Sequence, residues 1–197
     1  SDKPMAKALD SLAVARLSAL KVSITDGLRG ELIDRLAQVS TVESLTSLNL
    51  ENGHFGDAAI AKVLRSPHFT KLRRLNLQNN ALTSKIVRPL LDSPILPQLE
   101  LLSLGTRWTH GENLLEDVGV RLFTESSPPL QLRWLDFSSN RLSDSSAWDL
   151  AQSRFLKQIE CLYLGGNTFS RASRTALNAR FSNRVFFACC ESKSACR

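Results

Sequence analysis

Catalytic or metal chemistry needs clustered nucleophiles, bases or ligands, and this sequence offers few of them. It contains three histidines and four cysteines, and it lacks a G-x-S-x-G elbow, a P-loop, an H-E-x-x-H helix and paired C-x-x-C units. His110 has no neighbouring carboxylate–histidine pattern. We therefore expect no catalytic residues, no cofactor and no metal, and we keep an enzyme with an unrecognised site as an alternative.

The cysteines are Cys161, Cys189, Cys190 and Cys196, and three of them lie in the last nine residues. Their C-C-x5-C spacing differs from the C-x2-C pairs of zinc ribbons. We expect reduced thiols near the C-terminus, with a disulfide in an exported protein as the main alternative. Cys161 lies inside a leucine-containing segment, and we expect a small, half-exposed residue there.

Residues suited to recognition alternate with leucines in short segments. Arginine and aromatic side chains dominate protein interfaces. Alternation places such residues together on one face of a strand, opposite the leucines. We predict a partner-binding face on this basis, although any sheet face carries some aromatic residues. Its predicted members are Arg74, Asn76, Gln78, Trp134, Asp136 and Tyr163.

A repeated unit must position these residues. Residues 72–82 read L-x-x-L-x-L-x-x-N-x-L, and the L-x-x-L-x-L part, with Ile or Phe at single places, starts five clear units. Their second leucines are Leu48, Leu75, Leu102, Leu135 and Leu162, at steps of 27, 27, 33 and 27 residues. Leu20 lies 28 residues before Leu48 and indicates a degenerate first unit. Periods of about 20–29 residues with this pattern are typical of leucine-rich repeats.

The second half of each unit predicts a helix. Asp57, Ser84 and Asp144 stand nine residues after the second leucine, and all three are good N-cap residue types. Apolar residues follow these residues at +3 and +6, which describes one buried helix face. Ser66, Ser93 and Ser153 follow at +9, where we expect the helices to end.

The sequence resembles the ribonuclease-inhibitor-like subclass of leucine-rich repeat proteins, over roughly residues 17 to 187. The 27-residue step, the Ser-Pro after two helices and the ending at 176–185 look like bacterial members. The resemblance implies an α/β solenoid, a horseshoe arc with a parallel concave sheet and convex helices. It also implies a last helix that leads into a terminal strand.

The resemblance implies a structural role for the asparagine of the motif, present as Asn80, Asn140 and Asn167. Each is expected inside, bonded to backbone groups at the turn. Gly53 and Arg107 take this place in two repeats, and we expect less regular turns there.

The 33-residue step carries six extra residues, which we place before the helix, within residues 105–116. Insertions in repeat proteins form loops on one face, often the binding face. Trp108 is therefore a predicted partner-binding residue. The alternative is that Trp108 fills the inward apolar place of the turn, as Phe55 and Leu82 do.

The predicted organisation is an N-terminal helical cap (1–16), a repeat domain of about six repeats plus a terminal strand (17–187), and a Cys-containing tail (188–197). The formal net charge is +6, without a run of five or six basic residues. We expect a protein partner, with an acidic surface as the sharper hypothesis, and no nucleic acid and no membrane span. Few carboxylates lie on the predicted face, so we do not expect the chain to inhibit a basic ribonuclease. The sequence slightly favours the cytoplasm and leaves open a secreted or surface bacterial effector that acts on a host target.

Overall fold

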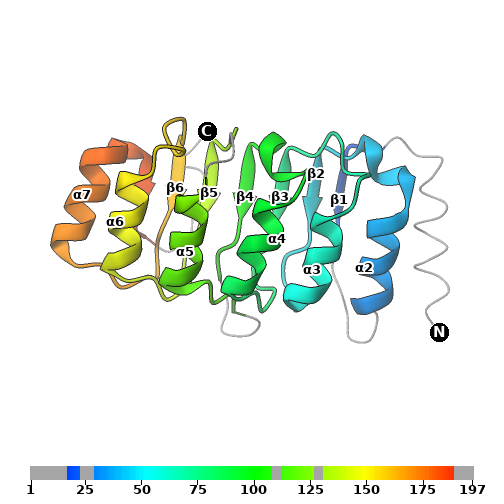
Figure 1. The fold of residues 1–197 in the computed structure, drawn as a ribbon, viewed down its shortest axis with the longest axis horizontal. Coiled ribbons are helices and arrows are strands. Elements are labelled where there is room, and N and C mark those ends of the chain that lie inside the picture. Colours follow the sequence, from blue (N-terminus) through cyan, green and yellow to red (C-terminus); the bar gives the residue numbers. More distant parts are fainter. Residues whose placement is uncertain (1–16, 23–28, 108–111, 127–130, 189–197) are drawn as a thin grey trace.

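The computed structural model describes residues 17–22, 29–107, 112–126 and 131–188. Over these residues, short strands alternate with helices along the chain (Figure 1). The strands are β1 (Ala19–Lys21), β2 (Ser47–Asn49), β3 (Arg74–Asn76), β4 (Leu101–Ser103), β5 (Trp134–Asp136), β6 (Cys161–Tyr163) and β7 (Val185–Phe186). The α-helices are α2 (Arg29–Gln38), α3 (Gly56–Leu64), α4 (Val87–Leu91), α5 (Glu116–Glu125), α6 (Asp144–Gln152) and α7 (Arg171–Phe181). The 3₁₀ turns are η2 (Ser40–Ser44), η3 (Ser84–Ile86), η4 (Leu96–Gln98) and η5 (Ser182–Arg184). The predicted cap at 1–16 and the tail cysteines lie outside the described residues.

The strands form one parallel sheet in sequence order, β1 to β7, and the helices lie on one side of it (Figure 1). The predicted α/β solenoid is confirmed: the sheet lines the concave side and the helices line the convex side. The second leucines pair strand to strand, from Leu20 through Leu48, Leu75, Leu102 and Leu135 to Leu162. The degenerate first repeat is therefore a real strand, and the last helix leads into β7, as predicted.

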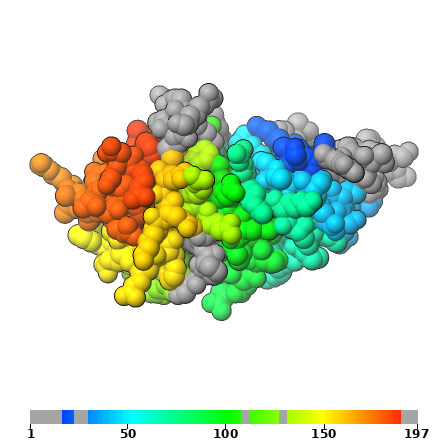
Figure 2. Space-filling model, turned by 90° about the horizontal axis from the view of Figure 1, so that it is seen from above, coloured from blue at the N-terminus to red at the C-terminus, as the bar shows by residue number. Residues whose placement is uncertain are grey.

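The core lies between the sheet and the helices. The second leucines of β2 to β6 are at most 1% exposed, and so are Phe69, Leu96 and Leu156 from the loops that follow the helices. Each repeat covers the apolar face of the next, so the repeats succeed one another along the molecule (Figure 2).

The motif asparagines connect neighbouring repeats. Asn80 Nδ2 donates to the Leu50 carbonyl (2.9 Å), Asn140 Nδ2 to the Leu104 carbonyl (2.9 Å), and Asn167 Nδ2 to the Phe137 carbonyl (3.0 Å). Each of these carbonyls belongs to the preceding repeat. The predicted inward asparagines are confirmed, and they hold backbone groups that the turns would otherwise leave unpaired.

The six extra residues lie before α5 and within residues 105–116, as predicted, but the prediction that Arg107 takes the asparagine place is wrong. Asn113, not Arg107, occupies the asparagine place of the long repeat: its Nδ2 donates to the Leu77 carbonyl (2.9 Å) and its Oδ1 accepts from Asn80 N–H (2.9 Å). The insertion therefore lies between Leu104 and Asn113. Leu115, two residues after Asn113 and 1% exposed, fills the inward apolar place that one alternative gave to Trp108.

The Gly53 turn keeps the backbone of the Asn80 turn, so the expectation of a less regular turn is wrong there. Asn52 and His54 have left-handed φ angles of 62° and 48°, and Asn79 and Ala81 have 52° and 54° at the equivalent places. A Cβ on Gly53 would lie 2.0 Å from the Phe55 ring. The ring thus occupies the space that the asparagine side chain takes in other repeats.

The residues predicted as helix caps, Asp57, Ser84 and Asp144, do not cap the helices. Thr83 and Ser143, which precede Ser84 and Asp144, provide the capping side chains, because they accept hydrogen bonds from Lys85 N–H and Ser145 N–H, whereas the N-cap residue of α3 makes no side-chain capping bond. Asp57 instead accepts from Thr83 N–H (2.9 Å), Asp117 from Ser143 N–H (2.9 Å) and Asp144 from Ser170 N–H (2.7 Å). Each aspartate therefore binds the helix start of the next repeat, forming a convex counterpart to the asparagine series.

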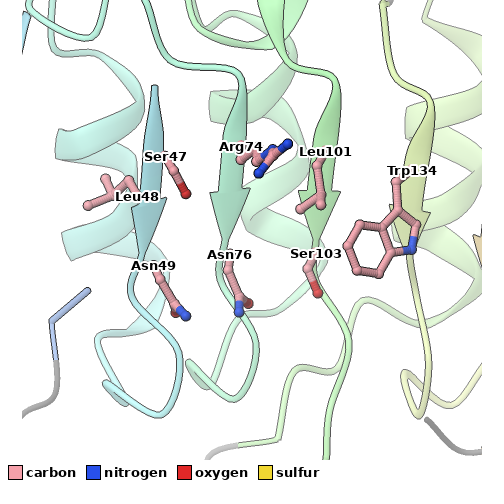
Figure 3. A pocket seen from close by; sticks show the side chains of 8 residues that line it. All are labelled: Ser47, Leu48, Asn49, Arg74, Asn76, Leu101, Ser103 and Trp134. Carbon is pink, nitrogen blue, oxygen red and sulfur yellow. The ribbon is translucent and has the colours of Figure 1, made fainter. Parts of the chain in front are cut away.

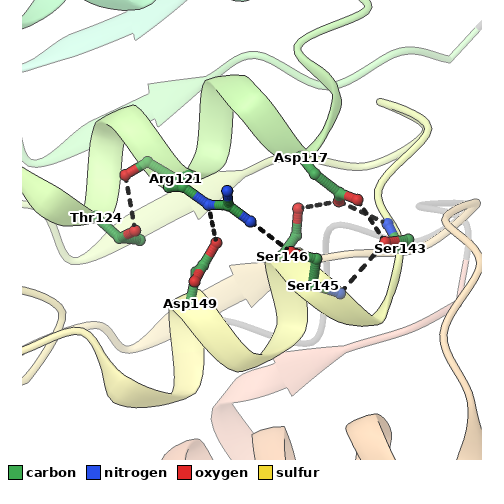
Figure 4. A network of polar contacts seen from close by, with 7 residues as sticks. All are labelled: Asp117, Arg121, Thr124, Ser143, Ser145, Ser146 and Asp149. Atoms are coloured by element: carbon green, nitrogen blue, oxygen red, sulfur yellow. Dashed lines mark hydrogen bonds and ion pairs between the residues drawn. The ribbon is translucent and has the colours of Figure 1, made fainter.

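Figure 4 shows one of these connections, between α5 and α6. Asp117 also accepts hydrogen bonds from the hydroxyls of Ser143 and Ser146. Burial raises the pKa of Asp117, but the hydrogen bonds from Ser143 and Ser146 outweigh it and hold the pKa below its ordinary value. Arg121 reaches across the same junction to Ser145 Oγ (2.9 Å) and Asp149 Oδ2 (3.5 Å).

Candidate functional site

The concave face is a grid because the strands pair without offset. One row runs across the sheet as Ser47, Arg74, Leu101 and Trp134, and the row two residues on runs as Asn49, Asn76, Ser103 and Asp136. A hollow of about 150 Å³ lies between these rows over β2 to β5. Figure 3 shows Arg74, Leu101 and Trp134 on successive strands of the first row.

The second row closes the strand ends. Asn49 Oδ1, Asn76 Oδ1 and Asp136 Oδ1 each accept from the backbone N–H two residues later, at 2.9, 3.0 and 2.9 Å. Short polar side chains favour this local bond where a backbone turns. Asn76 and Asp136, two predicted binding residues, therefore shape the strand ends of the concave face.

A buried polar network surrounds Asp136, which is 2% exposed. Its Oδ2 accepts from Gln78 Nε2 (2.6 Å) and Ser103 Oγ (2.9 Å), and its Oδ1 accepts from Ser138 Oγ (2.5 Å). A carboxylate out of water needs such donors. Gln78 is itself 1% exposed. Gln78 and Asp136 therefore support the concave face from below and are not accessible on its surface.

Gly105 makes room for this network. A Cβ there would lie 2.5 Å from both Asp136 Oδ1 and Ser138 Oγ. Gly105 follows β4, and it lies in the repeat between those of Gln78 and Asp136, so its missing side chain lets Gln78 reach across to the carboxylate.

Glu51 forms a second polar cluster towards the first repeats. Its carboxylate accepts from Lys21 Nζ (2.8 Å) and Asn76 Nδ2 (2.9 Å). Burial raises the pKa of Glu51, but Lys21 and the bonds from Asn49 and Asn76 outweigh it, so the pKa lies below its ordinary value. The carboxylates of Glu51 and Asp136 are thus both engaged by protein donors.

The other end of the face is aromatic. The Tyr163 ring lies 5.6 Å from the Trp134 ring and stacks on Phe186 at 5.0 Å. Trp134 is half-buried, whereas Tyr163 is 3% exposed. Trp134 and Tyr163, both predicted members of the binding face, therefore lie side by side.

Cys161, next in the row after Trp134, differs from its prediction. It is 7% exposed rather than half-exposed, and it is disulfide-bonded. The other three cysteines of the sequence lie outside the described residues.

The sheet thus brings six of the seven predicted binding residues onto one face, and Trp108 lies outside the described residues. Leu101 shares the first row with Arg74 and Trp134, although it was not among the seven predicted binding residues. Sequence reasoning also missed three exposed apolar side chains on the convex side: Val118 and Leu122 of α5, and Trp148 of α6.

Two further findings concern the described residues only. No group of three or more His, Cys, Asp or Glu side chains is placed to hold a metal ion within them. Their helices include none that is long and apolar enough to cross a membrane.

Comparison with known families agrees with the geometry. A leucine-rich repeat model matches residues 68–91, and a second leucine-rich repeat model matches residues 131–152. The comparison with curated proteins returns no match. The two matches and the seven-stranded parallel sheet identify a leucine-rich repeat protein, a class whose domains generally serve protein interaction.

Proposed function

We propose that this protein is an interaction module of the ribonuclease-inhibitor-like subclass, resembling bacterial members, and that it binds a protein partner on its concave face without catalysis. The subclass proposal is supported by the pairing of strands with α-helices, such as α3, α5 and α6, that span two turns or more. Shorter repeats lack room for such helices.

The observation that carries the binding proposal is the first row of the grid. Arg74 is exposed, and Leu101 and Trp134 are half-exposed, around one hollow of a rigid sheet. Tryptophan and arginine are among the residues that contribute most at interfaces, and the strands fix their backbone positions, which lowers the ordering cost on binding.

Affinity capture from the native cells tests the concave face. The bait pair is the Arg74→Ala/Trp134→Ala variant and a matched variant on the other side, Arg65→Ala/Trp148→Ala, since Arg65 is exposed at the end of α3 and Trp148 is 46% exposed. We expect the concave variant to lose the captured proteins and the convex variant to keep them. Equal capture by both variants would exclude the concave face.

The alternative function, a secreted or surface bacterial effector that acts on a host target, has one observation in its favour. Cys161 is disulfide-bonded, and disulfides persist in oxidising compartments and are rare in the cytosol. Alkylation of the freshly isolated native protein, with and without prior reduction, followed by mass spectrometry of the Cys161 peptide, tests this. Immediate alkylation of Cys161 without a reductant would remove the support.

A further inference from the structure

The hollow on the concave face has the size of a side chain, not of a small-molecule site. Its volume is about 150 Å³. Ligand pockets usually enclose about 300–1,000 Å³. The hollow is also shared by four strands, so its occupant must lie across the sheet, as a segment of another protein does (Figure 3).

Charge in and around the hollow is unbalanced. The Arg74 side chain is exposed, and its guanidinium forms no hydrogen bond or ion pair with the described residues. The carboxylates on this face are occupied elsewhere: Glu51 by Lys21 and Asn76, and Asp136 by Gln78, Ser103 and Ser138. The hollow therefore offers one free guanidinium among neutral groups.

Beside this cation, the hollow is apolar. Leu101 lies on the next strand and Trp134 on the one after, in register with Arg74. Neighbouring strands are about 4.8 Å apart, so the backbone positions of Arg74, Leu101 and Trp134 lie within about 10 Å of one another across the sheet. An arginine fork binds a carboxylate through two parallel hydrogen bonds, which fixes the orientation of the bound group.

We propose that this hollow binds an acidic–apolar segment of the protein partner: an Asp or Glu on Arg74, with a bulky apolar side chain two residues away on Leu101 and Trp134. In an extended segment, residues two apart point the same way and lie about 6.6 Å from each other, which matches this spacing. The proposal rests on the concave binding proposed above and adds the chemistry of the partner.

A nucleic acid fits the same surface less well. Its phosphates need several cations along the binding surface, because each phosphate contact contributes through counterion release. Among the described residues that line the hollow, Arg74 is the only cation. Lys21 lies beside the hollow, but it forms an ion pair with Glu51 at 2.8 Å. A protein segment with a single carboxylate matches the charge that is present.

Selection from a phage-displayed library of random twelve-residue peptides against the complete chain tests the proposal. We expect enriched peptides to share an Asp or Glu two residues from Leu, Ile, Phe, Tyr or Trp. Arg74→Ala should weaken binding of the enriched peptides about tenfold or more in fluorescence anisotropy, because a charge-assisted bond is lost. Selection against Arg74→Glu should instead enrich Lys or Arg at the acidic position.

Arg65→Glu is the matched control, since it makes the same change in net charge away from the sheet. It should leave the selected motif unchanged, and thermal unfolding should show that both variants are folded. Hydrogen exchange of the complex locates the peptides. Protection of β3 to β5 by peptides without the motif overturns the acidic–apolar chemistry and leaves the concave binding face standing. Protection confined to the helices overturns both proposals, and failure to enrich any motif overturns the inference drawn here.

Discussion

The side chain of Asn113 accepts a hydrogen bond from the backbone N–H of Asn80 at 2.9 Å, although 33 residues separate them. The same oxygen accepts from Leu82 N–H (3.0 Å), and its amide group donates to the carbonyls of Leu77 (2.9 Å) and Leu104 (3.0 Å). Asn113 thus continues the asparagine series across the insertion, and the long repeat stacks like its neighbours.

Replacing Asn113 by Ala should destabilise the protein strongly. The change leaves several buried backbone groups without partners, and each such group costs about 1–3 kcal/mol, so we expect a loss of about 3 kcal/mol or more. Urea unfolding followed by circular dichroism measures it. Asn178→Ala, at an exposed position of α7, is the control and should change stability by less than about 0.5 kcal/mol. Equal effects of the two substitutions would contradict the role of Asn113.

Gly105→Ala should lower stability by roughly 1–3 kcal/mol, because its methyl group displaces the Asp136 carboxylate from its donors. In the Asp136→Ala background the same change should cost less, and a double-mutant cycle measures this coupling. Gly30→Ala in α2 is the matched control: a Cβ there meets nothing within 4 Å, and we expect a gain of about 0.5–1 kcal/mol. Additive effects of the Gly105 and Asp136 substitutions would show that the two sites are independent.

Asp117 and Asp144, on the convex side, predict that the stability of the folded protein falls at acidic pH. The pKa of Asp117 and that of Asp144 both lie below the ordinary value of an aspartate in the folded protein; for Asp144 the bond from Ser170 N–H is the main cause. Lowered pKa values stabilise the folded state above the unfolded pKa, and this stabilisation is lost as pH falls through the folded pKa. Asp117→Asn should therefore unfold at a lower temperature than the parent at pH 7, and the difference should shrink below about pH 4. A difference that stays constant from pH 7 to pH 3 would contradict the assignment.

Truncating an inward leucine tests the strand register. Leu77 is fully buried, and Leu77→Ala should cost roughly 2–5 kcal/mol in the free energy of unfolding. Leu122, which is 39% exposed on α5, provides a leucine control whose truncation should cost less than about 1 kcal/mol. A loss below about 1 kcal/mol for Leu77→Ala would mean that this residue does not face the core.

Leucine spacing was sufficient to predict the strands, their parallel order and the burial of Leu75 and its equivalents, because a period of one repeat leaves few alternatives. The helix positions were also predictable, but the role of Asp57, Asp117 and Asp144 was not. Aspartate suits both an N-cap and a bond to the next repeat, and only the three-dimensional stacking separates the two. The position of the insertion was ambiguous for a similar reason: Asn113 follows Leu104 by nine residues instead of three, so a fixed count from the leucine points to Arg107.

The sequence predicted which residues lie on the concave face, but it did not predict how exposed each of them is. Alternation states which side of the sheet carries Gln78, Asp136 and Tyr163. It does not reveal that Gln78 reaches over Gly105 to Asp136, or that Tyr163 is covered by its aromatic neighbours. Exposure depends on these contacts between repeats, which no single repeat encodes.

Zero offset between strands has a consequence for how binding preference changes over generations. A segment that lies across the sheet meets one residue from each repeat, so the residues that select it stand 27 or 33 positions apart in the chain. Duplication or loss of the repeat between Arg74 and Trp134 would move these two side chains by one strand spacing, about 4.8 Å, and leave the stack intact. Gain or loss of whole repeats thus changes the distance between Arg74 and Trp134 in steps of one strand spacing.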